Sequence, residues 1–249
     1  IKRYFEESGF NRMDVRTAMF DMDGVLFDSM KNHARCWHET MTHYGYTFPE
    51  WEAYMHEGRT SAGTINIVSR RERGHDASEA EIEEMYSYKV GLFDQCAEAR
   101  EMPGAYDLLK KVKDSGITPM VVTGSGQHIL LDRLERAFPS IFQSDLMVTA
   151  FDVQHGKPNP EPYLMGLDKG SRFLGIDLQK NQSIVIENAP LGVQAGVASG
   201  VLTIAVNTGP LPDSALYDAS AHLLFHSMEE LCERWEELAA SLFSLKFKD

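Results

Sequence analysis

Two aspartates near the start of the chain have the residue types and the spacing to bind a divalent cation. Asp21 and Asp23 belong to the segment FDMDGVLFDS, which follows a short apolar stretch. Because Asp and Gly form turns more readily than strands, we expect a strand to end at Asp21 and the chain to turn by Gly24. In an open α/β sheet this edge binds ligands. Paired carboxylates there suit Mg²⁺, although this motif alone also fits a solvated acidic turn.

Three further segments place polar residues after an apolar or rigid stretch. VVTGSG ends in Thr123 and Ser125 before an expected helix, which is typical of an anion-binding turn. GKPNPEPY has three prolines that stiffen the backbone around Lys157 and favour charge neutralisation at a specific anion. SIVIENAPLG adds the carboxylate of Glu187 and the amide oxygen of Asn188. Each segment alone fits an ordinary turn, but four such ends on one sheet edge indicate a single site.

The elements that position these residues follow a regular order. Strand patterns alternate with helix patterns at lengths typical of an α/β fold with a doubly wound parallel sheet. Residues 31–99 show helical spacing and no convincing strand, which predicts an all-helical domain inserted above the Asp21 end of the sheet. We therefore predict a core of residues 1–29 and 101–249 and a helical domain of residues 30–100. The expected strands cover residues 17–21, 117–123, 146–149, 183–187, 201–206 and 222–225. The expected helices cover residues 30–44, 48–56, 60–71, 76–99, 106–115, 127–138, 161–169, 191–199 and 228–242, with residues 1–15 left as a short helix or a disordered lead-in.

Composition limits the classes of partner. The chain has 249 residues with 43% hydrophobic residues, enough for a packed core, and 24 Lys and Arg against 37 Asp and Glu give a net charge of −13. This charge argues against a nucleic acid or an anionic membrane as the main partner. The three cysteines are widely spaced and contain no CxxC pair, which favours free thiols in a reducing cytoplasm. No apolar run approaches the ~20 residues of a membrane span, and the first residues do not resemble a secretory signal.

The four segments, in this order, resemble the motifs of the haloacid dehalogenase (HAD)-like superfamily of phosphotransferases. DxDGVLFDS, VVTGS, GKPNPEPY and VIENAPLGVQAG carry the resemblance, which covers roughly residues 15–245. A helical insert after the first motif is similar to the β-phosphoglucomutase-like branch. The fourth motif, together with NTGP at residues 207–210, also resembles the inorganic pyrophosphatases of this superfamily.

The resemblance implies roles for the core residues. Asp21 is the nucleophile that forms an aspartyl phosphate, and Asp23 is the general acid and base. Thr123 and the amide of Gly124 bind phosphoryl oxygens, and Lys157 offsets charge on both nucleophile and phosphate.

The resemblance also implies a Mg²⁺ site. Its ligands are Asp21, the backbone carbonyl of Asp23, Glu187 and Asn188. The commoner family pattern has an Asp where this chain has Asn188, so the site carries one negative charge less.

The helical domain resembles the mobile cap of the family, which closes over the site and supplies specificity. His33 and Lys89 match cap positions that take part in closure and substrate contact, and Glu57 and Arg59 fall in the specificity loop. In the mutases a phosphate-binding Arg lies three residues after the glycine of this loop, where this chain has Ser61. That departure argues against a mutase.

We therefore expect a Mg²⁺-dependent phosphohydrolase that acts on a small phosphorylated substrate, with pyrophosphate as the specific hypothesis. The alternatives are a β-phosphoglucomutase acting on β-glucose 1-phosphate and a sugar-phosphate phosphatase. A non-catalytic module does not need the intact motifs, and hydrolytic dehalogenation does not need Asp23. We expect a monomer or weak dimer, and no nucleic-acid or membrane partner.

Overall fold

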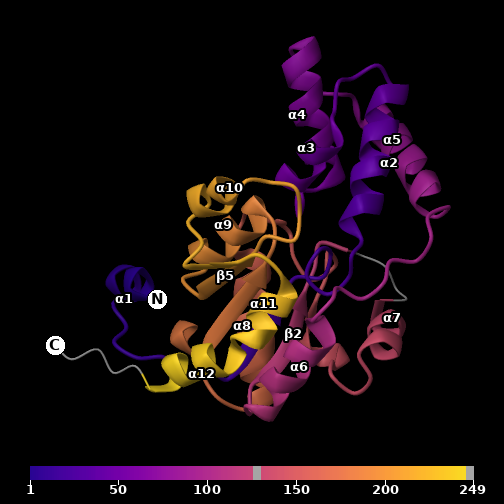
Figure 1. Cartoon of the computed structure of the whole chain (residues 1–249). Helices are drawn as coiled ribbons and strands as arrows, with labels where there is room; N and C mark the ends of the chain where they lie inside the picture. The colour runs from indigo at the N-terminus through magenta and orange to yellow at the C-terminus, as the bar shows by residue number, and fades with distance from the viewer. Residues whose placement is uncertain (126–129, 245–249) are drawn as a thin grey trace.

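The computed structural model describes residues 1–125 and 130–244. The sheet is parallel throughout, with the order β3-β2-β1-β4-β5-β6 (Figure 1). β1 and β4 are therefore neighbours at the point where the winding reverses, and in such sheets this point opens the crevice that binds ligands. The strands are β1 (Thr17–Phe20), β2 (Thr118–Val122), β3 (Met147–Val148), β4 (Ser183–Glu187), β5 (Leu202–Val206) and β6 (Leu223–Phe225).

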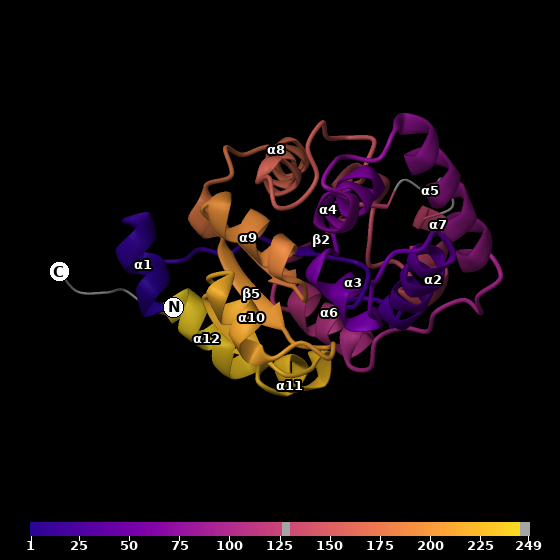
Figure 2. The same ribbon diagram turned by 90° about the horizontal axis from the view of Figure 1, so that it is seen from above.

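Helices cover both faces of the sheet, which confirms the predicted doubly wound α/β fold. One face packs against α6 (Ala105–Asp114), α7 (Leu130–Ala137), α11 (Met228–Glu233) and α12 (Trp235–Ser244). The other packs against α8 (Glu161–Leu174) and α9 (Pro190–Ala198), as the view in Figure 2 shows. The remaining elements of the core are α1 (Lys2–Ser8), α10 (Asp213–Asp218) and the 3-10 turns η1 (Ser144–Leu146) and η2 (Lys180–Gln182).

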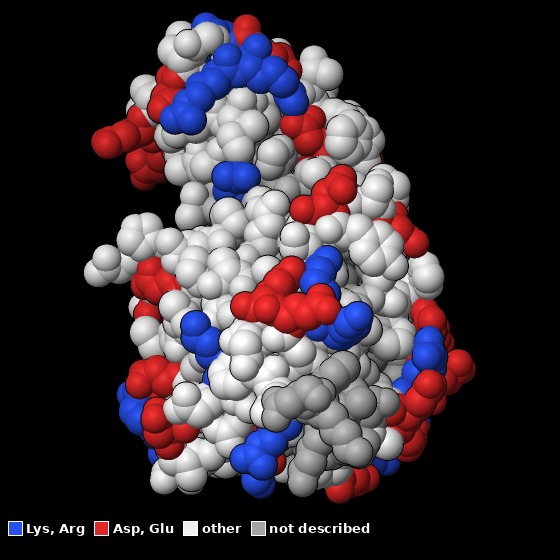
Figure 3. All heavy atoms as spheres, turned by 90° about the vertical axis from the view of Figure 1, so that its left-hand side faces the viewer, with Lys and Arg blue, Asp and Glu red and all other residues white. Residues whose placement is uncertain are grey.

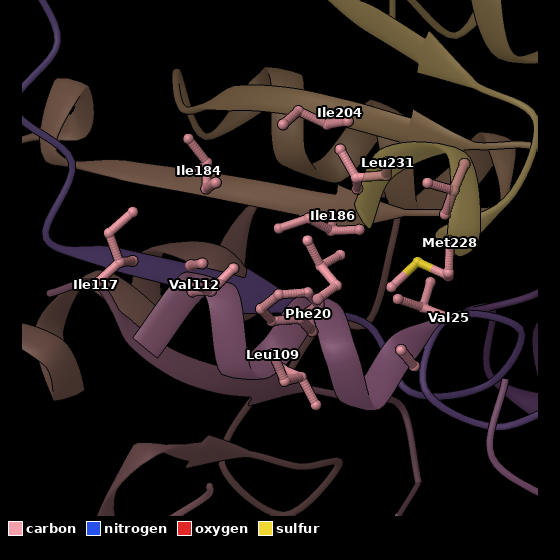
Figure 4. Close-up of a cluster of buried hydrophobic side chains, with 14 of the residues drawn as sticks. Phe20, Val25, Leu109, Val112, Ile117, Ile184, Ile186, Ile204, Met228 and Leu231 are labelled. Atoms are coloured by element: carbon pink, nitrogen blue, oxygen red, sulfur yellow. The ribbon is translucent and has the colours of Figure 1, made fainter. Parts of the chain in front are cut away.

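Alternation along the central strands separates the two sides of the core. Phe20 points toward α6 and α11, where Figure 4 shows it among Leu109, Ile186 and Met228. The preceding residue, Met19, packs on the opposite side against α8. Side chains of a strand alternate between faces, and strands covered on both faces are apolar throughout. This burial explains why the central strands read as continuous apolar runs ending abruptly in polar residues.

Four helices form a separate module above the carboxyl edge of the sheet (Figure 1). They are α2 (Met30–His43), α3 (Glu50–Met55), α4 (Ser61–Arg73) and α5 (Glu79–Phe93). Their apolar faces pack on one another in a cluster that includes Met41, Phe48, Ile65 and Met85. α5 begins with a capping box between Ser78 and Glu81. We call this module the cap; its predicted bounds, 30–100, stay a prediction.

Two linkers join the cap to the core and pair with each other. The amide of Asp28 donates to Arg100 O at 2.9 Å, and the amide of Met102 donates to Leu26 O at 2.8 Å. Phe27 and Glu101 form an antiparallel bridge between these contacts. The cap therefore stands on two short paired segments rather than on a single flexible connection.

Several element bounds differ from the prediction. α1 forms because Tyr4 and Phe5 bury their rings in the core. α8 runs to Leu174 instead of residue 169, since Gly170 packs against Leu178 and the left-handed Gly175 ends the helix. α5 ends at Phe93 rather than residue 99, the last helix divides near Arg234, and the six-residue α10 was missed. The predicted start of the 127–138 helix lies partly outside the described residues.

The surface agrees with the acidic composition. On the part of the face in Figure 3 that the structure describes, Lys and Arg side chains form a band across the top, with acidic side chains beside it, and lower down acidic and basic side chains are mixed. Within the described ranges, no helix has the length and apolar character needed to cross a bilayer. Cys36, Cys96 and Cys232 are free thiols.

Candidate active site

The predicted residues meet where strands β1, β2 and β4 end. Asp21 follows β1 directly, and its amide donates to Ile186 O of β4 at 3.0 Å. Thr123 follows β2, and its hydroxyl accepts the amide of Ser125 at 3.0 Å, forming the tight turn expected from VVTGS. The parallel strands thus bring residues more than a hundred positions apart to one edge.

Lys157 lies at the centre of this edge. Its ammonium donates to Asp21 Oδ1, to Glu187 Oε1 at 2.6 Å and to Val122 O at 3.3 Å. The side chain is 3% exposed. Burial alone lowers the pKa of Lys157, but the two carboxylates outweigh it and raise the pKa well above its usual value. The lysine is therefore a fixed positive charge beside the carboxylate of Asp21.

Glu187 is hydrogen-bonded through both carboxylate oxygens. Its Oε1 accepts from Lys157 at 2.6 Å and from the Tyr163 hydroxyl at 2.9 Å. Its Oε2 accepts the amides of Asn188 and Ala189 at 2.9 and 3.1 Å. In this arrangement Glu187 orients Lys157 and the turn after β4, and its role as a metal ligand stays a prediction.

Three other oxygens at this edge are buried with no hydrogen-bond partner among the residues that the structure describes. They are Asp21 Oδ2, Asn188 Oδ1 and Glu57 Oε1. Glu57 comes from the loop between α3 and α4, and its Oε2 accepts from Asn188 Nδ2 at 3.0 Å. Burial, followed by the charges of Asp21, Glu187 and Asp23, raises the pKa of Glu57 well above its usual value. A carboxylate from the cap is thus enclosed among the acidic groups of the core.

This arrangement fits a divalent cation. Buried polar atoms without partners are costly, and oxygen donors of this kind are the ligands that Mg²⁺ takes. Burial raises the pKa of Asp21 as well, with Lys157 opposing the effect and Glu187 and Asp23 adding to it. No three His, Cys, Asp or Glu side chains in the described ranges form a metal-binding group by themselves. The oxygens that this edge offers to a cation are therefore Asp21 Oδ2, Asn188 Oδ1 and Glu57 Oε1.

Asp23 ends a chain of polar contacts that runs into the cap. Its Oδ1 accepts from Ser29 Oγ at 2.5 Å and lies 3.6 Å from His33 Nε2. The other ring nitrogen, His33 Nδ1, lies 3.1 Å from Lys89 Nζ. Burial raises the pKa of Asp23, but His33, Ser29 and Arg133 outweigh it and lower the pKa to about 2. Lys89 thus contacts His33, and its predicted contact with the substrate stays a prediction.

The loop between α3 and α4 is docked on the core. Gly58 has φ 82°, and a Cβ there would lie 2.9 Å from Lys157 Cδ and 3.1 Å from Lys157 Cβ. A Cβ on Gly156 would lie 3.3 Å from Gly58 O. Only a glycine allows this approach, because it combines a left-handed backbone with no side chain. The cap is therefore closed over the site.

A cavity of about 490 Å³ lies between the cap and the core. The predicted residues in its lining are Asp21, Asp23, His33, Glu57, Arg59, Lys89, Thr123, Gly124 and Ser125. Arg59 has a buried Nε without a partner, and Ser61 lines the cavity beside it. Lys157, Glu187 and Asn188 lie behind the lining. Arg133 also lines the cavity and was not predicted, because a charged residue on an amphipathic helix reads as a solvated surface position.

Comparisons with known proteins identify the family. The family model described as haloacid dehalogenase-like hydrolase matches residues 18–206. Hexitol phosphatase A of Escherichia coli (strain K12) is 30% identical over 88% of this chain and 94% of its own length. Phosphorylated carbohydrates phosphatase of Thermotoga maritima is 27% identical over 87% of this chain and 97% of its own.

A solved structure named "Putative beta-phosphoglucomutase from Bacteroides vulgatus" is similar over nearly the whole chain. It is 58% identical, with a TM-score of 0.90, over 97% of this chain and 96% of its own. The matching family model, this likeness and the convergence of the four motifs at one sheet edge lead to a single assignment. The chain belongs to the haloacid dehalogenase-like hydrolase family, in its β-phosphoglucomutase-like branch of phosphatases and phosphotransferases.

Proposed function

We propose that this protein is a Mg²⁺-dependent phosphohydrolase that cleaves inorganic pyrophosphate through an aspartyl phosphate on Asp21. The observation that carries the proposal is Glu57. Its carboxylate is buried in the site, bonded to Asn188 at 3.0 Å, with one oxygen unpartnered. An additional carboxylate in a phosphate site is unfavourable unless a cation joins it to the substrate.

The charges of the cavity support a compact polyanion as substrate. Arg59, Lys89 and Arg133 line the cavity, and His33 and His56 lie in the same wall. Lys157 adds a buried positive charge behind Asp21. Such a site stabilises several negative charges at once, because the cationic groups are already in place. Pyrophosphate carries this charge density in a small volume.

Asp21 and Asp23 carry the proposed bond changes. Asp21 attacks the phosphorus, the bond to the leaving phosphate breaks, and the leaving oxygen takes a proton from Asp23. A water molecule then gives a proton to Asp23 and attacks the aspartyl phosphate, releasing Asp21 and inorganic phosphate. The low pKa of Asp23 in the free site means that it gains its first proton when the substrate adds negative charge nearby.

The other core residues bind and orient the phosphoryl group. The hydroxyl of Thr123 and the amide of Gly124 lie in the cavity wall, where they donate to phosphoryl oxygens. Lys157 neutralises charge on Asp21 and holds the carboxylate in one orientation. When Mg²⁺ is bound by Asp21, Asn188 and Glu57, it neutralises phosphoryl charge and favours an in-line approach.

A sugar-phosphate phosphatase is the second candidate. Two of the relatives are named for phosphorylated hexitols and carbohydrates. The cavity is also larger than pyrophosphate requires, and Trp37, Tyr86 and Phe93 line part of it. Aromatic side chains of this kind bind the apolar faces of sugars. A mutase is less well supported, because Ser61 occupies the position of the phosphate-binding cap arginine.

Glu57→Gln separates the two candidates. The substitution keeps the shape and removes the charge, so we expect kcat/KM for pyrophosphate to fall at least about a hundredfold if Glu57 holds the cation. The value for p-nitrophenyl phosphate should fall much less. Glu50→Gln, on the exposed start of α3, is the matched control and should change neither. Equal losses on both substrates would show that Glu57 acts only in cap docking.

A further inference from the structure

Arg133 of α7 lies in the cavity wall with most of its hydrogen-bonding capacity unused. Its side chain is 12% exposed. In the described part of the chain its guanidinium makes one long hydrogen bond, from Nη2 to Ala99 O at 3.4 Å. Nε is buried without a hydrogen-bond partner and lies 3.7 Å from the largely exposed carboxylate of Glu98. Because a guanidinium carries five N–H donors, this charge is poorly satisfied in the free protein.

The orientation of Arg133 is nevertheless fixed. Its guanidinium carbon lies 3.9 Å from the centre of the Phe27 ring, in a cation–π contact. Phe27 and Ala99 belong to the two linkers between core and cap. The contact with Phe27 holds the guanidinium in the cavity wall, and the planar fork of an arginine matches phosphate oxygens.

Arg133 shares the cavity with Asp23, the residue that protonates the leaving group in the proposed reaction. Both residues line the cavity, so both can face one bound substrate. In the proposed reaction Asp23 protonates the leaving oxygen, so a cation near Asp23 is on the leaving-group side. Lys157, in contrast, binds Asp21 on the side of the transferred phosphoryl group.

We propose that Arg133 binds the non-transferred, anionic end of the substrate and makes the enzyme prefer a diphosphate over a phosphomonoester. This inference rests on the proposed function, whose leaving group is a phosphate. It also places the second phosphate on the core. A mutase would instead hold that phosphate with the cap arginine, whose position is occupied by Ser61 in this chain. Arg133 is thus a specificity-determining residue contributed by a helix that does not move with the cap.

Calorimetric titration with two non-hydrolysable probes, in excess Mg²⁺, tests the proposal. Methylenediphosphonate carries two phosphonates, and methylphosphonate carries one. We expect the wild type to bind the diphosphonate more tightly, and Arg133→Gln to weaken that binding about ten- to hundredfold while leaving methylphosphonate within about twofold. Arg136→Gln is the matched control, because Arg136 also contacts Glu98 but is 64% exposed and does not line the cavity.

Equal weakening of both probes, or the same effect in Arg136→Gln, would overturn the proposal, as would a wild type that binds both probes alike. Should Arg133→Gln fail to fold, Arg133→Lys keeps the charge but loses the planar fork, and should still bind the diphosphonate several-fold more weakly. The outcome is separate from the proposed function. Selective loss of diphosphonate binding in an enzyme that does not cleave pyrophosphate would retain the Arg133 site and reject the reaction.

Discussion

Gly58→Ala should reduce activity far more than it reduces stability. Gly58 has φ 82°, so an alanine there is strained by about 1–2 kcal/mol in any cap position. The added methyl would also lie 2.9 Å from Lys157 Cδ, but only when the loop is docked. Lys157 cannot move aside easily, since two carboxylates and Val122 O hold its ammonium. Overpacking of this kind costs about 1–3 kcal/mol.

The steric clash with Lys157 acts only on the closed state of the cap, so it should lower kcat/KM. A penalty of about 1–3 kcal/mol lowers kcat/KM about 5- to 150-fold. Gly74→Ala is the control, because Gly74 has φ 81° and its Cβ would meet nothing within 4 Å. We expect similar losses of unfolding free energy in urea for both variants, but a loss of kcat/KM only for Gly58→Ala. Activity of Gly58→Ala within twofold of Gly74→Ala would refute a closed cap as the working state.

Two further predictions concern the nucleophile and the core. Asp21→Asn should lower the rate of phosphate release below about a thousandth of wild type, because it removes the proposed nucleophile. The unfolding transition should stay cooperative, because the substitution keeps the shape of the side chain. Higher residual activity would indicate direct attack by water. His222 is held neutral, since its Nδ1 accepts the Thr203 amide at 3.0 Å, and burial lowers its pKa from 6.5 to about 4. The unfolded chain therefore binds more protons between these pH values, and the unfolding free energy should fall by about 2 kcal/mol as the pH drops from 6.5 to 4. His222→Asn keeps an acceptor without titrating, so urea titrations at pH 7 and 5 should show a smaller pH dependence; an unchanged dependence would contradict this account.

The sheet was predictable because its strands are buried on both faces. Apolar runs such as SIVIE end sharply in polar residues. The alternation of these strand patterns with helix patterns predicts a parallel sheet. The ends of β1, β2 and β4 then had to meet, so Asp21, Thr123 and Glu187 were found from local pattern alone. Short elements were missed: α10 has six residues, too few for a clear helical period.

The parts of the site that depend on tertiary contacts were not predictable. The hydrogen bonds to the carboxylate of Glu187 come from Tyr163 and from two amides of its own turn, among others. No spacing in the sequence predicts that geometry. Arg133 reads as a surface residue until the linkers are folded against it. Glu57 was singled out by its place in the specificity loop that the family resemblance implies, but only the docked loop shows that it reaches Asn188.

Phosphate release from pyrophosphate in saturating Mg²⁺, beside the same assay with a hexitol phosphate, tests the central claim most directly. We predict a kcat/KM for pyrophosphate above about 10⁴ M⁻¹s⁻¹, the lower edge of ordinary enzymes, and at least about a hundredfold above that for the hexitol phosphate. The activity should disappear with EDTA and return with added Mg²⁺. A rate on pyrophosphate equal to that of the EDTA-treated enzyme, or a preference for the hexitol phosphate, would contradict the claim.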